Sequence, residues 1–325
     1  MTRPIFITGG AGRIGRRILR QLLDHGRAVR VLVHRSEPEG VQGDGMTIVR
    51  GDIKDRSSFA EALDGCGCVC HLASVFDMLE GPKYETNNDL LFHNIIEGTY
   101  NLLDASRVAG VEQFVYASTD AVFTAIYKPH PEPITEEIEL CPKTGRFYAL
   151  AKATCESMCI NYSKTYGLPC TIIRVGWCLD ETDVLESFRY GFWSSLMLEP
   201  EAKRVLDRLG GDERAIVAPQ FGDGTPAALQ LGHAEDVATG FVLAMNRPEA
   251  AADQVFNIAG GEPYRYQDVV ERVAIGLDKP WQAARIDSIH PYTISVDKAR
   301  RLLGYAPRYD LAAMVEEALA GAGSS

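Results

Sequence analysis

Residues 4–15 read PIFITGGAGRIG, in which an apolar run ends on closely spaced glycines. The tripeptide Ile5-Phe6-Ile7 is typical of a buried strand. Downstream, apolar residues recur at the spacing of one helix face, at Ile14, Ile18, Leu19, Leu22 and Leu23. The glycines at positions 9, 10, 12 and 15 therefore occupy a strand-to-helix turn, where the backbone bends sharply and a phosphate can approach the N–H groups at the helix start. This arrangement predicts dinucleotide binding, with a ligand-free glycine loop as the alternative.

Strand-like and helix-like segments continue to alternate along the chain. Apolar, strand-like segments lie at 28–35, 46–55, 68–74, 113–119, 170–175 and 254–260, and helical segments at 57–65, 87–110, 147–167 and 233–248. This order predicts an α/β fold with a doubly wound parallel sheet of the Rossmann type. We expect residues 1–176 to form a dinucleotide-binding domain that carries the catalytic residues. Residues 177–325 are expected to form mainly a smaller, substrate-binding C-terminal lobe, with some segments returning to the sheet.

The charge balance limits the partners that the chain can have. Its formal net charge is −11, and its calculated isoelectric point is near 5.2. A nucleic-acid surface requires concentrated Lys and Arg, so no nucleic-acid partner is expected. The sequence contains no run of about eighteen apolar residues and no leader-like start, so we expect a cytoplasmic protein that does not contact membranes.

The eight cysteines do not have the spacing of a metal site. Cys66, Cys68 and Cys70 alternate along an apolar run, and Cys155 and Cys159 are one helical turn apart. Neither set contains the paired C-x-x-C spacing of structural zinc sites. Reduced, structural thiols and no metal are therefore expected.

Two groups of residues are suited to acid/base chemistry. Tyr148 and Lys152 are four apart, which places them on one face of a helix, and a nearby ammonium lowers the pKa of a phenol. Such a phenol can act as acid or base toward an alcohol or ketone. Ser118, Thr119 and Asp120 end a predicted parallel strand, the place where ligands meet an open α/β sheet. A surface pair on the helix and a simple turn cap at the strand end are the alternatives.

Together, in this order, these features resemble the extended short-chain dehydrogenase/reductases, the NAD(P)-dependent sugar epimerase/dehydratase family. The resemblance covers nearly the whole chain. The matching segments are TGGAGRIG, GDI, HLA, NIIEGTYNLLDAS, YASTDAVF and YALAK, followed by HAEDVATG, FNIAGGE and SVDKARRLLGYAP.

The resemblance implies a role for each site residue. Thr119 would hold the substrate oxygen, Tyr148 would be the acid/base, and Lys152 would bind the nicotinamide ribose and lower the tyrosine pKa. Cofactor contacts are implied at Gly9, Gly12, Arg13, Ile14, Gly15, His34, Arg35, Asp52, Ile53, Leu72, Ala73, Tyr148 and Lys152. Substrate contacts are expected at Ser118, Asp120, Trp177 and Arg285.

One departure from the family pattern concerns the cofactor. NAD-using relatives usually carry an acidic residue after the second strand, whereas this chain reads LVHRS there. We therefore expect NADP, with NAD as the alternative. Arg35 can pair with the 2′-phosphate, and Arg13 can assist, because a guanidinium binds phosphate well. The alternative for Arg35 is a solvated loop residue.

Other departures concern the substrate. Ala121 stands where 4,6-dehydratases carry a glutamate base, which disfavours a dehydratase. Trp177 replaces an asparagine, and Leu229 replaces an arginine that often meets the substrate diphosphate, whereas the second such arginine is retained as Arg285. A nucleotide-sugar substrate is weakened by these changes but stays possible.

Three functions are compatible with the sequence. The first is an NAD(P)-dependent oxidoreductase acting on a secondary alcohol or ketone, with a sugar or nucleotide sugar as substrate. The second is a nucleotide-sugar epimerase with transient oxidation and no net use of cofactor. The third is a non-catalytic, NADP-sensing binding protein, disfavoured by the intact Thr119, Tyr148 and Lys152. A homodimer is expected through residues 87–109 and 147–166, where Leu90, Leu91, Ile95, Leu102 and Leu103 provide apolar surface.

Overall fold

A seven-stranded parallel sheet forms the centre of the computed structural model, which describes residues 3–75, 87–123, 126, 128–140 and 146–322. The strand order is β11-β6-β5-β4-β1-β2-β3. The strands are β1 (Ile5–Thr8), β2 (Val29–Val33), β3 (Met46–Arg50), β4 (Cys68–His71), β5 (Gln113–Thr119), β6 (Cys170–Val175) and β11 (Val255–Ile258). The direction of winding reverses between β1 and β4, which confirms the doubly wound Rossmann-type sheet.

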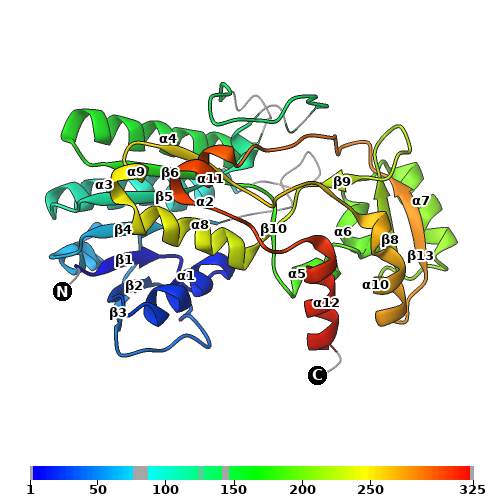
Figure 1. Cartoon of the computed structure of the whole chain (residues 1–325), viewed down its shortest axis with the longest axis horizontal. Coiled ribbons are helices and arrows are strands. Elements are labelled where there is room, and N and C mark those ends of the chain that lie inside the picture. The colour runs from blue at the N-terminus through cyan, green and yellow to red at the C-terminus, as the bar shows by residue number, and fades with distance from the viewer. Residues whose placement is uncertain (1–2, 76–86, 124–125, 127, 141–145, 323–325) are drawn as a thin grey trace.

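Helices cover both faces of this sheet, as the buried strands require. In β1, Ile5 and Ile7 face one hydrophobic cluster and Phe6 faces another. The first cluster includes residues of α1 (Arg13–Asp24) and α8 (Ala234–Asn246), and the second includes residues of α3 (Gly98–Val108) and α4 (Phe147–Tyr166). Figure 1 shows these two helical layers on either side of the strands. The carboxyl ends of the strands thus form the one edge of the sheet where a ligand can enter between the layers.

The predicted helix at 57–65 is wrong, whereas the predicted helical segment at 87–110 is confirmed over 88–108 and contains a π-helical stretch. The segment 57–65 forms two 3-10 turns, Arg56–Ser58 and Ala60–Leu63, because Asp55 and Ser58 make short local hydrogen bonds that compete with an α-helix. The segment 87–110 is broken into α2 (Asn88–Leu91), a π-helical stretch at Phe92–Glu97, and α3. Within the described ranges, no helix is long and apolar enough to cross a membrane.

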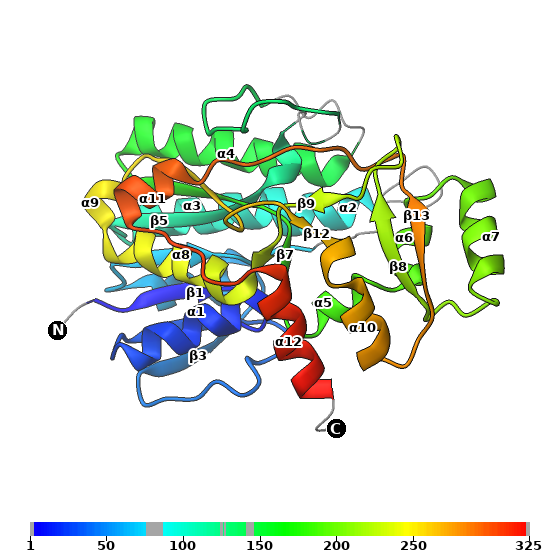
Figure 2. The same cartoon turned by 45° about the vertical axis from the view of Figure 1, so that its right-hand side comes forward.

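The segment after β6 builds a third hydrophobic cluster, apart from the sheet. Its core contains the buried aromatic side chains Phe188, Trp193 and Tyr266. Around them pack α5 (Asp183–Glu186), α6 (Tyr190–Ser194), α7 (Glu199–Arg208), β8 (Ile216–Gln220), α10 (Val270–Gly276), β13 (Trp281–Arg285) and α12 (Leu311–Ala322). In Figures 1 and 2 this lobe lies to the right of the sheet. Two pairs of short strands lie outside the main sheet: β7 (Cys178–Leu179) with β10 (Gly232–His233), and β9 (Ala228–Leu229) with β12 (Tyr264–Arg265). The remaining helices of this half of the chain are α9 (Pro248–Ala251), directly before β11, and α11 (Asp297–Leu303).

The described cysteines are free thiols, and all but the partly buried Cys178 are buried. Cys68 and Cys70 lie in β4, and Cys155 and Cys159 lie on the inner face of α4. Burial raises the pKa of the Cys70 and Cys159 thiols well above the ordinary value. These side chains therefore act as small apolar core residues, as the sequence predicts.

Candidate active site

The glycine turn between β1 and α1 leaves no room for side chains. Gly9 has a φ of +73°, and a Cβ there would lie 2.6 Å from the Ala73 nitrogen. A Cβ on Gly15 would lie 2.2 Å from the Gly9 carbonyl oxygen. Gly12 is the N-cap of α1 and offers no side-chain acceptor to the first turn. The N–H groups at this helix start therefore have the geometry that binds a pyrophosphate.

A cavity of about 310 Å³ opens at this turn, at the point where the strand order reverses. Its lining comes from the loops after four adjacent strands and from one residue of the π-helical stretch: Thr8, Gly9, Gly10, Ala11, Gly12, Leu32, His34, Ser36, Gly51, Asp52, Ile53, Leu72, Ala73, Ser74, Val75 and Asn94. Seven of the predicted cofactor residues are among them: Gly9, Gly12, His34, Asp52, Ile53, Leu72 and Ala73. The polar lining and the glycine cradle fit a dinucleotide.

The polar side chains of Thr8, Ser36 and Asn94 also line the cavity and are not among the predicted cofactor residues. Thr8 belongs to the T-G-x-x-G-x-x-G segment, so its motif position could have identified it. Asn94 is the first residue of the segment NIIEGTYNLLDAS. It lies in the π-helical stretch at Phe92–Glu97 and lines the cavity from there. Wide helical turns of this kind are often found at functional sites. Ser36 lies in a loop without a sequence signal.

The far end of the cavity holds the Asp52 carboxylate. It lies 3.6 Å from Nε2 of His34 and 3.4 Å from Nζ of Lys54, and it accepts the N–H of Lys54. Partial burial raises the pKa of Asp52, but the N–H and charge of Lys54 together with His34 outweigh it and hold the pKa below its ordinary value. Arg35 is exposed near this end, is not among the lining residues, and forms no ion pair with any described residue.

A buried histidine ties the elements at the switch point together. His71 lies between Thr8 and Thr99, with Nδ1 2.7 Å from one hydroxyl and Nε2 2.9 Å from the other. Thr8 also accepts the Ala73 N–H at 3.1 Å. Burial, helped by the charge of Lys152, lowers the pKa of His71 to about 3, so the imidazole stays neutral. This bridge fixes β1, β4 and α3 relative to each other beneath the cavity.

Thr119 and Asp120 lie at the carboxyl end of β5. The Thr119 hydroxyl accepts the Ala121 N–H at 3.2 Å and donates to Oδ1 of Asp120 at 3.3 Å. Burial raises the pKa of Asp120 to about 6, although hydrogen bonds from Thr119, Ala121 and the backbone of Trp177 oppose this rise. The strand end thus carries a hydroxyl bonded to a carboxyl group that titrates near neutrality.

Helix α4 brings Tyr148 and Lys152 to the same strand. The Lys152 ammonium is buried and donates to the Ala117 carbonyl at 2.9 Å. Its Nζ lies 5.9 Å from the centre of the Tyr148 ring and 5.1 Å from that of Tyr116. Burial lowers the pKa of Lys152 to about 8. Helix α4 therefore places Lys152 next to the Tyr148 ring and on β5, two residues before Thr119.

Ser118 points away from this edge. Its hydroxyl donates to Oε1 of Glu156 at 2.5 Å, and Glu156 forms a buried ion pair with Arg174 at 2.8 Å. Ser118 is only 5% exposed. Ser118 lies on the opposite face of β5 from its neighbour Thr119, because successive side chains of a strand point to opposite faces, and its observed partner is Glu156.

Two predicted arginines also have intramolecular partners. Arg285 is exposed, and its guanidinium donates to the Gly222 carbonyl. The Arg13 guanidinium donates to the Cys178 carbonyl at 2.8 Å and lies 2.6 Å from the Asp183 carboxylate, so it contacts the second lobe rather than the end of the cavity where Arg35 lies. Trp177 follows β6 and stacks on Phe192, with ring centres 5.8 Å apart. Of the remaining predicted cofactor residues, Ile14 packs partly buried against the core, and Gly15 supports the turn.

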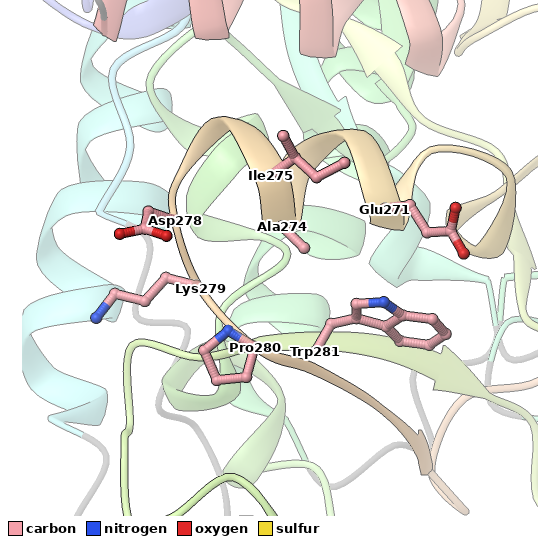
Figure 3. A pocket seen from close by; sticks show the side chains of 7 residues that line it. All are labelled: Glu271, Ala274, Ile275, Asp278, Lys279, Pro280 and Trp281. Atoms are coloured by element: carbon pink, nitrogen blue, oxygen red, sulfur yellow. The ribbon is translucent and has the colours of Figure 1, made fainter.

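A second cavity, of about 500 Å³, lies in the lobe between α10 and β13. Figure 3 shows its charged side chains, with Asp278 and Lys279 on one side and Glu271 on the other. Lys279 is paired with Asp212 at 2.8 Å. The polar groups do not converge on a common point, unlike those of a small-molecule site.

Comparisons with known proteins agree with this geometry. The model of a family described as "NAD dependent epimerase/dehydratase family" matches residues 5–259. A UDP-glucose 4-epimerase from Corynebacterium glutamicum is 29% identical, covering 97% of this chain and 94% of the relative. A dTDP-glucose 4,6-dehydratase from Streptomyces antibioticus is 27% identical, covering 95% of this chain and 89% of the relative. A short-chain dehydrogenase/reductase superfamily protein from Agrobacterium tumefaciens, solved with bound NAD, superimposes with a TM-score of 0.83 at 26% identity, covering 99% of this chain and 97% of that structure.

Proposed function

Because the chain belongs to the NAD dependent epimerase/dehydratase family, we propose that it transfers hydride at a secondary alcohol or ketone of a sugar or nucleotide sugar. The chain is an enzyme of the short-chain dehydrogenase/reductase type, and its cofactor is a nicotinamide dinucleotide. The observation that carries the proposal is the position of Tyr148 and Lys152 on α4, where Lys152 bonds to β5 two residues before Thr119. This position is at the sheet edge that also holds the dinucleotide cavity.

When bound, the cofactor supplies a hydride acceptor or donor at its nicotinamide ring. The glycine turn and the loops after β1 to β4 would hold it, with the pyrophosphate at the start of α1. Lys152, whose ammonium donates to the Ala117 carbonyl, retains further donors for the ribose hydroxyls. Its charge close to the Tyr148 ring favours the phenolate form of that tyrosine.

The proton of the substrate hydroxyl moves to Tyr148 in the oxidation direction and returns from it in the reduction direction. Thr119 positions the substrate oxygen. The hydrogen of the substrate alcohol points at Tyr148, so Thr119 would hold the substrate oxygen by turning its own hydroxyl hydrogen from Asp120 to that oxygen. The same hydrogen bond would hold the carbonyl oxygen of the product.

We propose NADP as the preferred cofactor. No carboxylate follows β2, where the residues are His34, Arg35 and Ser36, and a carboxylate there would repel a 2′-phosphate. His34 and Ser36 line the cavity, and the exposed Arg35 has the reach to pair with a phosphate at its rim. NAD is the alternative, since the similar Agrobacterium tumefaciens structure contains NAD.

We also propose that residues 177–325 mainly form the substrate-binding lobe and that the chain is a homodimer. Support for the lobe is its own hydrophobic cluster beside the catalytic edge. Support for the dimer is a set of exposed apolar side chains on α2, the π-helical stretch, α3 and α4: Leu90, Phe92, Tyr100, Leu150, Ile160 and Tyr166. Four of the five residues expected at this interface, Leu91, Ile95, Leu102 and Leu103, instead face the core of their own chain.

The test is an assay of purified protein with nucleotide sugars and free sugars, each with NADP⁺ or NAD⁺. An oxidoreductase produces reduced cofactor in a fixed ratio to the oxidised product. An epimerase, the second candidate suggested by the Corynebacterium glutamicum relative, interconverts two sugars without net reduction. Binding of the dinucleotide without turnover of any substrate would favour a non-catalytic sensor and contradict the proposal.

A further inference from the structure

The glycine turn is tied to the second lobe by two arginines of α1. Arg17 is 7% exposed and lies among Asp180, Glu181 and Glu235, while also donating to the Arg13 carbonyl at 3.0 Å. Arg17 is therefore a buried anchor between α1 and the loop before α5. Arg13 differs, because its side chain is 40% exposed and its backbone opens the helix at which the pyrophosphate would bind.

The Arg13 side chain extends from that helix start to the lobe. One guanidinium nitrogen donates to the Cys178 carbonyl at 2.8 Å, and the other lies 2.6 Å from the Asp183 carboxylate. Its Nε lies 3.8 Å from Asp180, which in turn accepts the N–H groups of Thr182 and Asp183 at 3.1 Å each. One side chain thus holds the whole turn that joins β7 to α5.

This turn is connected to the catalytic strand end. The turn follows β6, which pairs with β5 up to Val175 and Thr119, so the chain leaves β6 beside the strand end that carries Thr119 and Asp120. A path therefore runs from the start of α1 through Arg13 and Cys178 to the neighbouring ends of β6 and β5. Asp180 and Asp183 lie close enough to interact with each other, so they need the positive charge of Arg13 between them.

We infer that Arg13 is a positioning residue that couples occupation of the glycine turn by the cofactor to the placement of the Trp177–Asp183 segment beside Thr119 and Asp120. A bound pyrophosphate fixes the first turn of α1, and with it the base of the Arg13 side chain. The guanidinium transmits that constraint to the Cys178 carbonyl and Asp183. Such coupling is reciprocal, so a substrate that fixes the lobe segment also tightens cofactor binding. The inference rests on the proposed function, because it needs a dinucleotide at the turn.

Hydrogen exchange followed by mass spectrometry tests the coupling without a substrate. The wild-type protein is measured alone, with NADP⁺, and with NAD⁺ in a parallel arm, over peptides covering 9–16 and 178–188. We expect the better-bound dinucleotide to slow exchange in both peptides, by about five-fold or more in 178–188. Slowing in 9–16 alone would overturn the inference and leave the proposed function standing. No slowing in 9–16 with either dinucleotide would contradict the proposed function, and the inference with it.

Arg13→Gln separates positioning from a merely structural ion pair. We expect it to keep the cofactor-dependent slowing in 9–16 and to lose it in 178–188. If Arg13 were only a structural ion pair, Arg13→Gln would speed exchange in 178–188 equally with and without cofactor. If Arg13 contacted the phosphate directly, Arg13→Gln would abolish the slowing in both peptides. Either result overturns the inference. Asp183→Asn, expected to act like Arg13→Gln, provides the test if that variant does not fold. Arg20→Gln, an exposed arginine on the same helix, is the control that should behave as wild type.

Discussion

Lys152 combines a charge with burial, and this has a measurable effect on stability. Its pKa falls from the ordinary 10.5 to about 8 because burial disfavours the ammonium. Between these two values the unfolded chain holds the proton while the folded chain has lost it. The free energy of unfolding of the wild type therefore rises with pH relative to a variant without the group.

Lys152→Met provides that comparison. We expect the difference in the free energy of unfolding, wild type minus variant, to become more positive from pH 7.5 to 10.5 by on the order of 3 kcal/mol. Urea unfolding of the cofactor-free proteins across this range measures it, and titration of groups that Lys152 does not influence cancels in the difference. A difference that stays constant with pH would mean that Lys152 keeps its ordinary pKa in the folded protein.

Tyr148→Phe removes one hydroxyl from a partly buried ring at the end of β5. We expect kcat to fall about 100-fold or more, because the lost proton transfer matters mainly in the transition state, whereas the dissociation constant of the cofactor should change little. Lys152→Ala should lower kcat and also weaken cofactor binding. Stopped-flow turnover and fluorescence titration of the reduced cofactor measure the two quantities. Near wild-type turnover by Tyr148→Phe would remove this tyrosine from the mechanism.

Arg35→Asp tests the choice of cofactor. It replaces an exposed guanidinium, which has no ion pair with a described residue, by a carboxylate that repels a 2′-phosphate. We expect the dissociation constant of NADPH to rise by about 30-fold and that of NADH to stay nearly constant. Arg50→Gln, which loses an ion pair with Glu37 in the same region, is a matched control for loss of charge alone. An equal loss for both cofactors would show that Arg35 does not recognise the phosphate.

At the scale of elements, the sequence predicts best what depends on local pattern. The parallel strands and the helices at α1, α4 and α8 follow from apolar periodicity, and the glycine turn follows from its spacing. Apolar periodicity does not predict the 3-10 turn at Arg56–Ser58 or the π-helical stretch at Phe92–Glu97. The three helix types differ only in which carbonyl accepts each N–H, and a few hydrogen bonds of nearly equal energy decide between them.

The missed side-chain roles depend on partners that are distant in sequence. Arg13 finds Cys178 and Asp183 only after the lobe has packed against α1. Ser118 turns toward Glu156 because α4 places that carboxylate over β5. The pKa of Asp120 depends on burial and on the backbone of Trp177 at the end of the neighbouring strand. None of these contacts is encoded in the spacing of the motif that contains the residue.

The pair Glu156 and Arg174 joins α4 to β6 beneath the site. Both side chains are at most 5% exposed, and Glu156 also accepts the Ser118 hydroxyl. Arg174→Met leaves a buried carboxylate without its partner, which we expect to lower the free energy of unfolding by about 3 to 5 kcal/mol. The double variant Arg174→Met, Glu156→Leu should recover a large part of that loss, since no charge stays buried. Urea unfolding measures both, and additive losses would mean that the two residues do not act as a pair.

At the scale of the whole molecule, the outer surface of α2, α3 and α4 has an uneven distribution of apolar side chains. Tyr100, Leu150 and Ile160 are between 43% and 50% exposed, whereas the apolar residues of the inner face are buried. A monomer would leave these side chains in water together. The large apolar residues exposed on the lobe within the described ranges are fewer: Leu198 directly before α7 and Ile275 in α10. The helical surface is therefore the better candidate for contact with a second copy of the chain.

Ile160→Glu introduces a charge into this surface, at an exposed apolar position of α4. In a symmetric dimer each substitution occurs twice, so the two new carboxylates are desolvated at one interface, and we expect the dissociation constant of the dimer to rise by about 100-fold or more. Multi-angle light scattering at micromolar concentration should then give the mass of a dimer for the wild type and of a monomer for the variant. Leu198→Glu, at an exposed position on the lobe, should stay dimeric and control for the general effect of an added charge. Thermal unfolding of the variants, compared with that of the wild type diluted until it is monomeric, should be unchanged and would show that folding is intact. A wild-type protein that is monomeric at micromolar concentration would contradict the proposed dimer.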